Sequence, residues 1–279
     1  MNEGEHALIE RAKTGDREAL DALLHRYQGA IYRFGLRLCR DEEDAEDIAQ
    51  ETMLSMARSI ESYRGDASLS TWLYTIARSH CIKKRRRSKF APAEESSLDD
   101  ENFSDAKRLS PEDDHPDEAL FKRQLERALS EAIDSLEPEY REVVILRDVE
   151  GFRAKEASEI LGISVAALKS RLHRARVAIR DALEPFLNES IEALPKAAGT
   201  CPDIPVLYSQ HLEGEISPTL CASMEAHLAS CERCDAICDS LRRSLALCRT
   251  YEADAIIPDA LAESIRSRIR VLFPAERAP

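Results

Sequence analysis

The sequence has little glycine, no long apolar run and no sustained alternation of apolar and polar residues. Only 9 of its 279 residues are glycine, and its apolar residues recur at helical spacing. That spacing favours an all-α fold over one built from strands. No apolar run approaches the roughly 20 residues that cross a bilayer, and the first residues lack a signal-peptide pattern. We therefore expect a soluble, cytoplasmic chain with no membrane partner.

The sequence also lacks the motifs of common enzyme classes. It contains no His-Glu-x-x-His motif and no recognisable activated nucleophile. Its single set of predicted metal ligands, described below, leaves no coordination position open for water or substrate. We therefore expect a protein that is not an enzyme and has no catalytic residues.

Acidic charge is abundant but unevenly placed. The net charge is -13, which at first sight argues against a nucleic-acid partner. Between residues 94 and 118, eleven acidic residues stand against two basic ones, a net charge of -9, so about -4 remains for the rest of the chain. The run Lys83–Arg87 and the segment 169–180 are locally basic. The overall charge therefore does not exclude DNA binding.

Changes in periodicity divide the chain into modules, in agreement with the two or three domains expected for this length. Residues 1–90 and 120–188 carry apolar residues at helical spacing, whereas 91–119 are rich in charge, Ser and Pro without a period. A Pro/Ala connector leads to a Cys/His-rich module at 200–250, and the tail 251–279 holds one weak amphipathic helix. We predict two helical domains joined by an acidic linker, then a small metal-binding domain and a tail.

The second helical domain contains the pattern of a helix-turn-helix. Gly162 suits the left-handed position that ends one helix, and Ser164 is placed to cap the next. Apolar residues form one face of that next helix: Val165, Leu168, Leu172, Ala175 and Ile179. Such a helix, with a polar and basic opposite face, is typical of major-groove recognition. A solvated face of a structural bundle is the alternative.

The polar face supplies the candidate DNA-binding side chains. Lys169 and Arg174 are suited to neutralising phosphates, and Ser170, Arg171 and His173 to reaching base edges.

A second basic surface lies in the first domain. The run Lys83–Arg87 follows Tyr63, Trp72 and Tyr74 along the chain. Cations beside aromatic rings suit phosphate contact combined with stacking of unpaired bases. A charged helix end is the alternative interpretation of the run.

Six of the eight cysteines lie between residues 201 and 248. Cys201, His227, Cys231 and Cys234 offer three thiolates and one imidazole, which is a complete tetrahedral set for zinc or another thiophilic ion such as copper or cadmium. The closed set indicates a structural or sensing site. The remaining cysteines are expected to pack in the protein: Cys39, Cys81, Cys221, Cys238 and Cys248. Cys238 lies one helical turn beyond Cys234, so it is also placed to join the metal site.

Two sets of motifs resemble the extracytoplasmic-function (ECF) sigma factors. Asp44–Glu51 and Tyr63–Arg78 resemble conserved region 2 of that family, and Leu136–Gly151 with Ala157–Arg176 resembles region 4. The Cys/His-rich module is similar to the zinc-binding anti-sigma domain, which normally stands on a separate inhibitor protein. Fusion of these parts in one chain is the unusual feature.

The resemblance implies a role for each part. The 44–60 helix would dock on core RNA polymerase, whose β′ and β subunits bind the sigma factor. Asp47, Gln50 and Glu51 would make the contacts, and no partner for these three side chains within the chain is evident. The second helix-turn-helix would read the -35 element, and the acidic linker would thread toward the RNA exit path. The -10 element would be opened and read by a further set: Tyr63, Arg64, Trp72, Ser79, Lys83, Lys84 and Arg85. Ser79 stands where the family usually has Asn.

The third module is open to two opposite interpretations. As an anti-sigma-like domain it would contact the sigma domains within the chain and inhibit them, whereas as a metal-responsive tail it would be needed for activity. A stand-alone helix-turn-helix regulator with a metal- or redox-sensing domain is the alternative function, but it would not require the motif at residues 44–78.

Overall fold

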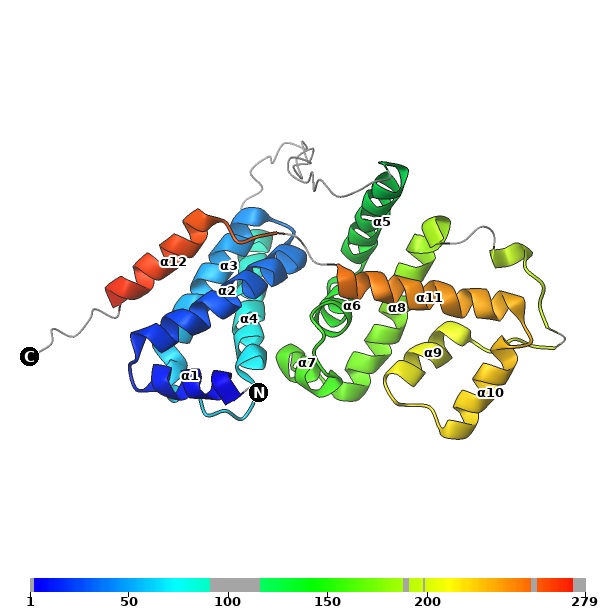
Figure 1. Cartoon of the computed structure of the whole chain (residues 1–279), viewed down its shortest axis with the longest axis horizontal. Helices are drawn as coiled ribbons and strands as arrows, with labels where there is room; N and C mark the ends of the chain where they lie inside the picture. Colours follow the sequence, from blue (N-terminus) through cyan, green and yellow to red (C-terminus); the bar gives the residue numbers. More distant parts are fainter. Residues whose placement is uncertain (1–2, 91–115, 188–190, 198, 252–254, 273–279) are drawn as a thin grey trace, which may run out of the picture.

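The computed structural model describes residues 3–90, 116–187, 191–197, 199–251 and 255–272. Within these ranges the chain is helical and contains no strand, which confirms the predicted all-α fold. No helix in the described part combines the length and apolar character that crossing a bilayer requires. In Figure 1 the helices form three bodies in a row, and the last helix returns to the first body.

The first body is a four-helix unit. Its elements are α1 (Glu3–Lys13), α2 (Arg17–Cys39), α3 (Glu42–Ser59), a 3₁₀ turn at Ile60–Ser62 and α4 (Leu69–Phe90). Asp16 and Asp41 accept hydrogen bonds from backbone N–H groups at the starts of α2 and α3, which satisfies donors that a helix start leaves free. The apolar stripes of α2 and α3 then bury Phe34 and Met53 in a common core.

The second body contains the helix-turn-helix. Its elements are α5 (Pro116–Ser135), α6 (Pro138–Val144), a π-helical turn at Ile145–Val149, α7 (Ala154–Leu161) and α8 (Val165–Leu187). Gly162 ends α7 with φ of +67°, and the Ser164 hydroxyl accepts from the Ala167 N–H at 3.1 Å, so both predicted helix signals are confirmed. The predicted apolar face of α8 is buried except for Val165, which is exposed.

The third body is small and has its own core. Its elements are a 3₁₀ turn at Ile191–Ala193, α9 (Ile204–Leu212), α10 (Pro218–Leu228) and α11 (Glu232–Thr250). The start of α11 shares the small core with α9 and α10, while the rest of α11 packs along α8. Helix α11 therefore ties the small body to the helix-turn-helix (Figure 1).

The last helix, α12 (Asp259–Leu272), packs against α3 in the first body. Its apolar stripe is buried there: Leu261, Ala262, Ile265 and Ile269. The sequence predicts this amphipathic helix, but its position on the far side of the molecule from α9 and α10 was not predicted (Figure 1).

The predicted acidic linker lies mostly outside the described residues. Only its last four positions are described, and they form the first turn of α5, which begins at Pro116 rather than at residue 120.

Candidate nucleic-acid interface and metal centre

The four predicted metal ligands converge in the small body. One ligand atom from each of Cys201, His227, Cys231 and Cys234 lies within 4.8 Å of all the others. The Cys201 and Cys231 sulfurs are 4.0 Å apart, close to the edge of about 3.8 Å that two thiolates span around tetrahedral zinc. The buried Nε2 atom of His227 has no hydrogen-bond partner among the described residues. The donor set therefore fits one tetrahedral ion.

Local structure explains how the ligands meet. His227 lies in the last turn of α10, Cys231 is the residue that precedes α11, and Cys234 lies in its first turn. Cys201 stands in the segment before α9. Cys238, which the sequence also places near the site, is buried but is not among the converging ligands of the described residues.

The two buried thiols of the set differ electrostatically. Backbone N–H groups, first that of Ala197 and then that of Cys234, hold the pKa of Cys231 below its usual value, at about 6. Burial raises the pKa of Cys234 to about 12. A bound dication would favour the thiolate form of both cysteines, because metal binding displaces the thiol protons.

The predicted recognition helix exposes only part of its polar face. Ser170 and Arg174 are exposed, and the Arg174 guanidinium donates to the Tyr140 hydroxyl at 3.3 Å. Arg171 forms an ion pair of 2.8 Å with Glu139. These three side chains remain at the surface of the helix-turn-helix.

The other two predicted side chains of this face contact the turn after α9. The Lys169 ammonium donates to the Glu213 carbonyl at 3.0 Å and lies 3.3 Å from the Glu215 carboxylate. His173 contacts the Ser209 hydroxyl at 2.6 Å and Glu215 at 3.1 Å. Only 17% of the Lys169 side chain and 13% of the His173 side chain are exposed. The turn therefore covers this edge of α8.

A buried ionic network beneath the turn was missed by the sequence reasoning. Arg176 makes a bidentate contact of 2.6 and 2.9 Å with Asp148, and it also lies 2.9 Å from Glu213. Arg147 forms a further ion pair with Glu213 at 3.2 Å. Burial opposes the charge of Arg176, but the hydrogen bonds and charges of Asp148 and Glu213 outweigh that effect and raise its pKa.

A signal for this network was present in the sequence. Arg176 stands four residues after Leu172 and three before Ile179, on the apolar stripe of α8. An arginine on such a stripe is a buried charge, and a buried charge requires a partner.

The predicted polymerase-docking residues lie on α3. Glu51 is exposed, whereas Asp47 forms an ion pair of 2.6 Å with Lys84. The Gln50 amide donates to the Ser264 hydroxyl of α12 at 2.9 Å. The expectation that these groups have no partner within the chain is therefore wrong for Asp47 and Gln50.

The loop at 63–67 lines a cavity at the surface of the first body. The cavity has a volume of about 310 Å³ and is also lined by Glu159 of α7. Tyr63 and Trp72 are among the lining residues, with ring centroids 5.3 Å apart. Arg64 is exposed, and the Ser79 hydroxyl is turned to the Ile76 carbonyl at 2.8 Å. The aromatic members of the predicted -10 set are thus brought together, while Ser79 is not among the lining residues.

The basic run on α4 is partly neutralised. Lys83 is exposed, but Lys84 also pairs with Asp44 at 2.6 Å. Arg85 lies 2.8 Å from Glu142 of α6. The side chains of Arg86 and Arg87 lie outside the described residues.

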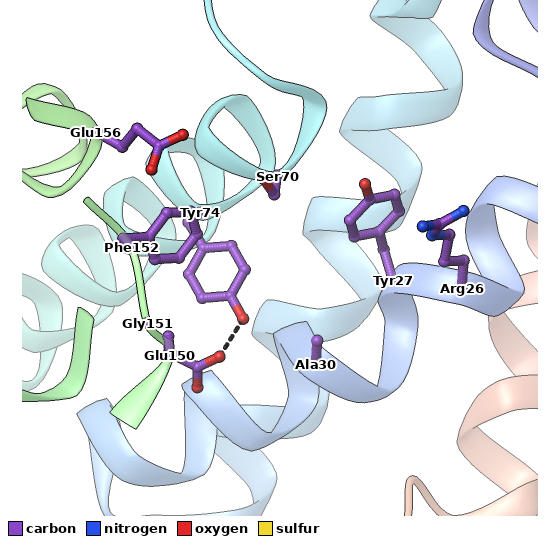
Figure 2. Close-up of a pocket in the computed structure, with 9 residues that line it drawn as sticks. All are labelled: Arg26, Tyr27, Ala30, Ser70, Tyr74, Glu150, Gly151, Phe152 and Glu156. Carbon is purple, nitrogen blue, oxygen red and sulfur yellow. Dashed lines mark hydrogen bonds between the residues drawn. The ribbon is translucent and has the colours of Figure 1, made fainter. Parts of the chain in front are cut away.

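The region 2-like and region 4-like motifs meet at a second cavity, of about 400 Å³, which Figure 2 shows. The Tyr74 hydroxyl from α4 donates to Glu150 at 2.6 Å, the dashed line in that figure. Glu150 also accepts from Arg37 of α2 at 2.5 Å, and Phe152 packs edge-on against the Tyr74 ring at 4.7 Å. The first two bodies are therefore held together by side chains from both motifs.

Comparison with known proteins identifies the class. Family models match Sigma-70 region 2 at residues 23–90, Sigma-70 region 4 at 126–179 and a zinc-finger family at 207–234. The RNA polymerase sigma-H factor of Pseudomonas aeruginosa is 30% identical over 192 residues, which cover 67% of this chain and 98% of the relative. The ECF RNA polymerase sigma-E factor of Haemophilus influenzae is 31% identical over 189 residues, covering 66% and 97%.

A solved structure of the sigma factor RpoE in complex with the anti-sigma factor NepR from Bartonella quintana is 24% identical, with a TM-score of 0.43, and the match covers 58% of this chain and 94% of that chain.

The chain belongs to the sigma-70 family of RNA polymerase sigma factors. Within that family it is an ECF sigma factor that carries a zinc-finger module similar to anti-sigma domains after region 4. Sigma factors are transcription initiation factors without enzymatic activity, and they bind core RNA polymerase and promoter DNA. The predicted family, function and non-enzymatic character are therefore confirmed.

Proposed function

We propose that this chain directs core polymerase to promoters from a closed state, in which its own C-terminal part covers the faces that bind DNA and polymerase. The observation that carries this proposal is the contact of Lys169 and His173 with the turn that holds Glu213 and Glu215. The chain acts in the cytoplasm, where core polymerase works.

The working residues are those that the sequence predicts. Asp47, Gln50 and Glu51 dock on polymerase through its β′ and β subunits. The aromatic and basic set from Tyr63 to Arg85 reads the -10 element. The helix α8 reads the -35 element through Lys169, Ser170, Arg171, His173 and Arg174. The module boundaries at 1–90, 91–119, 120–188, 200–250 and 251–279 belong to the same proposal.

The cover over α8 competes with DNA for the same cations. A phosphate backbone is recognised by Lys and Arg through charge, and Glu213 and Glu215 offer carboxylates in its place. Lys169 cannot neutralise a phosphate while its ammonium group is held by the turn. DNA binding therefore requires the turn to leave α8.

The cover over α3 competes with polymerase for a protein surface. Helix α12 buries its apolar stripe against α3, and Ser264 occupies the hydrogen bond of Gln50. Because Gln50 and α12 lie together, a polymerase subunit that uses Gln50 must displace α12. The same chain thus closes both faces, that of α3 in the first body and that of α8 in the second (Figure 1).

The four-ligand site organises the polar cover. Cys231 and Cys234 belong to the small core that also contains Ile204 of α9. Loss of the ion would therefore destabilise α9 and the turn after it, which carries Glu213 and Glu215. Zinc is the ion that the three thiols and one imidazole fit best, and another thiophilic ion would bind through the same atoms.

Run-off transcription with core polymerase tests the proposal. The full chain is compared with Cys231→Ser and with a truncation after Asn188, each with and without a chelator. Constitutive transcription by both variants supports inhibition in cis. Loss of transcription by both would instead make the module a positive element. Cys39→Ala, which leaves all four ligands in place, serves as the matched control and should behave as the wild type.

If Cys231→Ser binds no metal yet transcribes like the wild type under every metal condition, the metal-binding module neither inhibits nor activates transcription, and the proposed regulation is wrong.

A further inference from the structure

Two free cysteines face each other in the first body, where the end of α2 meets α4. Cys39 is the last residue of α2, and Cys81 lies in the middle of α4. Their sulfur atoms are 3.1 Å apart, closer than the 4.0 Å between the metal ligands Cys201 and Cys231. Neither Cys39 nor Cys81 belongs to the metal-binding group. The sequence predicts only that both residues pack in the protein.

The two sulfurs can form a disulfide after a small movement. A disulfide holds its sulfurs about 2.05 Å apart, so this pair has to close by about 1 Å. Cys81 is part of the core of the first body, and Cys39 packs against that core. Packing therefore keeps the two thiols next to each other while both are free.

The two thiols differ in exposure and in acidity. Cys39 is half-buried, whereas Cys81 is 0% exposed. The hydrogen bond with Cys81 outweighs burial and lowers the pKa of Cys39 below its ordinary value. The same hydrogen bond, together with burial, raises the pKa of Cys81. A more acidic thiol that solvent can reach, beside a second thiol, is the usual arrangement of an oxidisable cysteine and its resolving partner.

We propose that hydrogen peroxide joins Cys39 and Cys81 in a disulfide within region 2. The Cys39 thiolate attacks one peroxide oxygen: an S–O bond forms, the O–O bond breaks, and the departing hydroxide takes up the proton that Cys39 released. The Cys81 sulfur then attacks the Cys39 sulfur, so that an S–S bond forms and the S–O bond breaks. The second hydroxide leaves with the Cys81 proton as water. The two thiols lose two electrons in total, and the peroxide gains them.

The cysteine pair lies where region 2 holds region 4. Three arginines next to the pair form ion pairs of 2.8 to 3.3 Å with carboxylates of region 4: Arg40 with Asp134, and Arg78 and Arg85 with Glu142. Arg40 directly follows Cys39, and the other two arginines lie one helical turn on either side of Cys81. A bond between the two sulfurs therefore fixes these three arginines relative to one another.

The contact between the two regions has to break on a promoter. The -35 and -10 elements lie about 25 base pairs apart, which is ~85 Å along B-DNA at about 3.4 Å per base pair. Regions 2 and 4 touch in this structure, so they cannot occupy both elements in this arrangement. The disulfide holds the arginines as region 4 requires them, and oxidation therefore favours the closed form and lowers promoter affinity. This regulatory role rests on the proposed reading of the two elements by the two regions.

Hydrogen peroxide serves as the probe, applied to the full chain loaded with zinc. Peptide mapping without reductant should find the Cys39 and Cys81 peptides joined, and dithiothreitol should separate them by thiol–disulfide exchange. Cys221→Ser removes a half-buried cysteine outside the pair and outside the metal ligands. This matched control should form the same link. Absence of the link in the wild type, at a peroxide concentration that oxidises Cys221, overturns the disulfide.

The single variants test the order of the two steps. In Cys81→Ser, peroxide should leave Cys39 as a sulfenic acid, which a 1,3-dione reagent labels. In Cys39→Ser, the buried Cys81 should stay reduced and unlabelled. A label on Cys81 in Cys39→Ser, with none on Cys39 in Cys81→Ser, would overturn the assigned order.

The regulatory role is measured as affinity for a promoter fragment that carries both elements. Wild type and Cys39→Ser should bind it equally in reducing buffer. After peroxide, the wild type should bind about fivefold or more weakly than Cys39→Ser, the usual lower end of coupling between sites. Oxidation of the metal ligands is common to both proteins, so the ratio isolates the disulfide. A linked wild type that binds like Cys39→Ser would overturn the regulatory role.

Failure of the underlying proposed function has a different signature. If regions 2 and 4 do not read the two elements, the reduced wild type fails to distinguish the promoter fragment from one in which both elements are scrambled. Detection of the linked peptides is independent of that result.

Discussion

The edge of α8 that carries Lys169 and His173, and the helix α3, are both covered by the C-terminal part of the chain, but by contacts of opposite chemistry. The cover on α8 is polar, since Glu213 and Glu215 engage Arg176, Lys169 and His173. The cover on α3 is mainly apolar: α12 buries a stripe that includes Ile265 at 0% exposure and adds one hydrogen bond. DNA presents phosphates, whereas the centre of a protein interface is depleted of charge. The acidic cover on α8 therefore resembles DNA in its charge, and the apolar cover on α3 resembles the surface of a protein partner such as polymerase.

The difference indicates how each cover is released. The contacts of Glu215, whose side chain is 31% exposed, weaken as salt rises. The buried pair of Glu213 and Arg176 and the apolar face of α12 are much less sensitive to salt. The α8 cover also depends on the small body and its metal ligands, while α12 packs on α3 through its own side chains. The two faces should therefore open independently, and the following changes separate them.

Removal of the ion should have the largest effect. Structural zinc contributes roughly 10–16 kcal/mol to the folding of small zinc modules, which exceeds the stability of a core as small as that around Cys231. Chelation should unfold α9 and α10, lower the helical signal in circular dichroism and raise affinity for -35 DNA. Polymerase affinity should stay unchanged, because α12 does not belong to that core. Equal release of both faces would contradict the comparison.

Glu213→Gln should have the next largest effect. The Glu213 side chain is 1% exposed and pairs with both Arg176 and Arg147. Breaking a buried pair by removing one charge costs about 3 kcal/mol or more, so affinity for -35 DNA should rise by about 100-fold. Fluorescence anisotropy with labelled promoter DNA measures it. Glu232→Gln, which removes a carboxylate from an exposed position on α11, should leave the affinity unchanged.

Ile265→Glu should open the other face. Burial of an isoleucine side chain contributes about 1.5–3 kcal/mol, and a buried carboxylate without a partner adds a further cost. Affinity for core polymerase should therefore rise by about tenfold or more, as measured by surface plasmon resonance. Val271→Glu changes a residue of α12 that is 77% exposed and should not alter the affinity. A similar rise with both variants would argue against specific packing of the stripe.

Arg171→Ala and Arg174→Ala should lower affinity for -35 DNA, whereas Glu213→Gln raises it, and by a similar or smaller factor. Both side chains are at the surface of α8, and loss of a good base contact costs about 1–3 kcal/mol. Tested in the Glu213→Gln background, where α8 is open, each should lower affinity for -35 DNA by about 5- to 150-fold, and DNA with a scrambled -35 element serves as the control. Unchanged discrimination between the two DNAs would remove these arginines from the recognition set.

Local features were the most predictable from the sequence. Gly162, Ser164 and the stripe of α8 are set by spacing within one helix pair, and His227, Cys231 and Cys234 by spacing across one turn. These relations depend on nearby residues and on helix geometry.

Contacts between modules were not predictable in the same way. The partners of Gln50 and Lys169 lie 214 and 44 residues away along the chain, and no local period encodes such pairings. The apolar stripe of α12 predicts that the helix is buried against another element, but it does not identify α3 as that element. Arg176 is intermediate, because its place on an apolar stripe indicates burial and a partner, but does not identify Asp148 and Glu213 as that partner.

The most direct test of the account is run-off transcription by the double variant Glu213→Gln with Ile265→Glu, beside each single variant and the wild type. Transcription requires both faces, and the two covers are proposed to open independently. Each single variant should therefore raise the transcript yield at limiting sigma factor, and the double variant should raise it by about the product of the two increases. A double variant that folds, retains its metal and still transcribes like the wild type would contradict closure in cis.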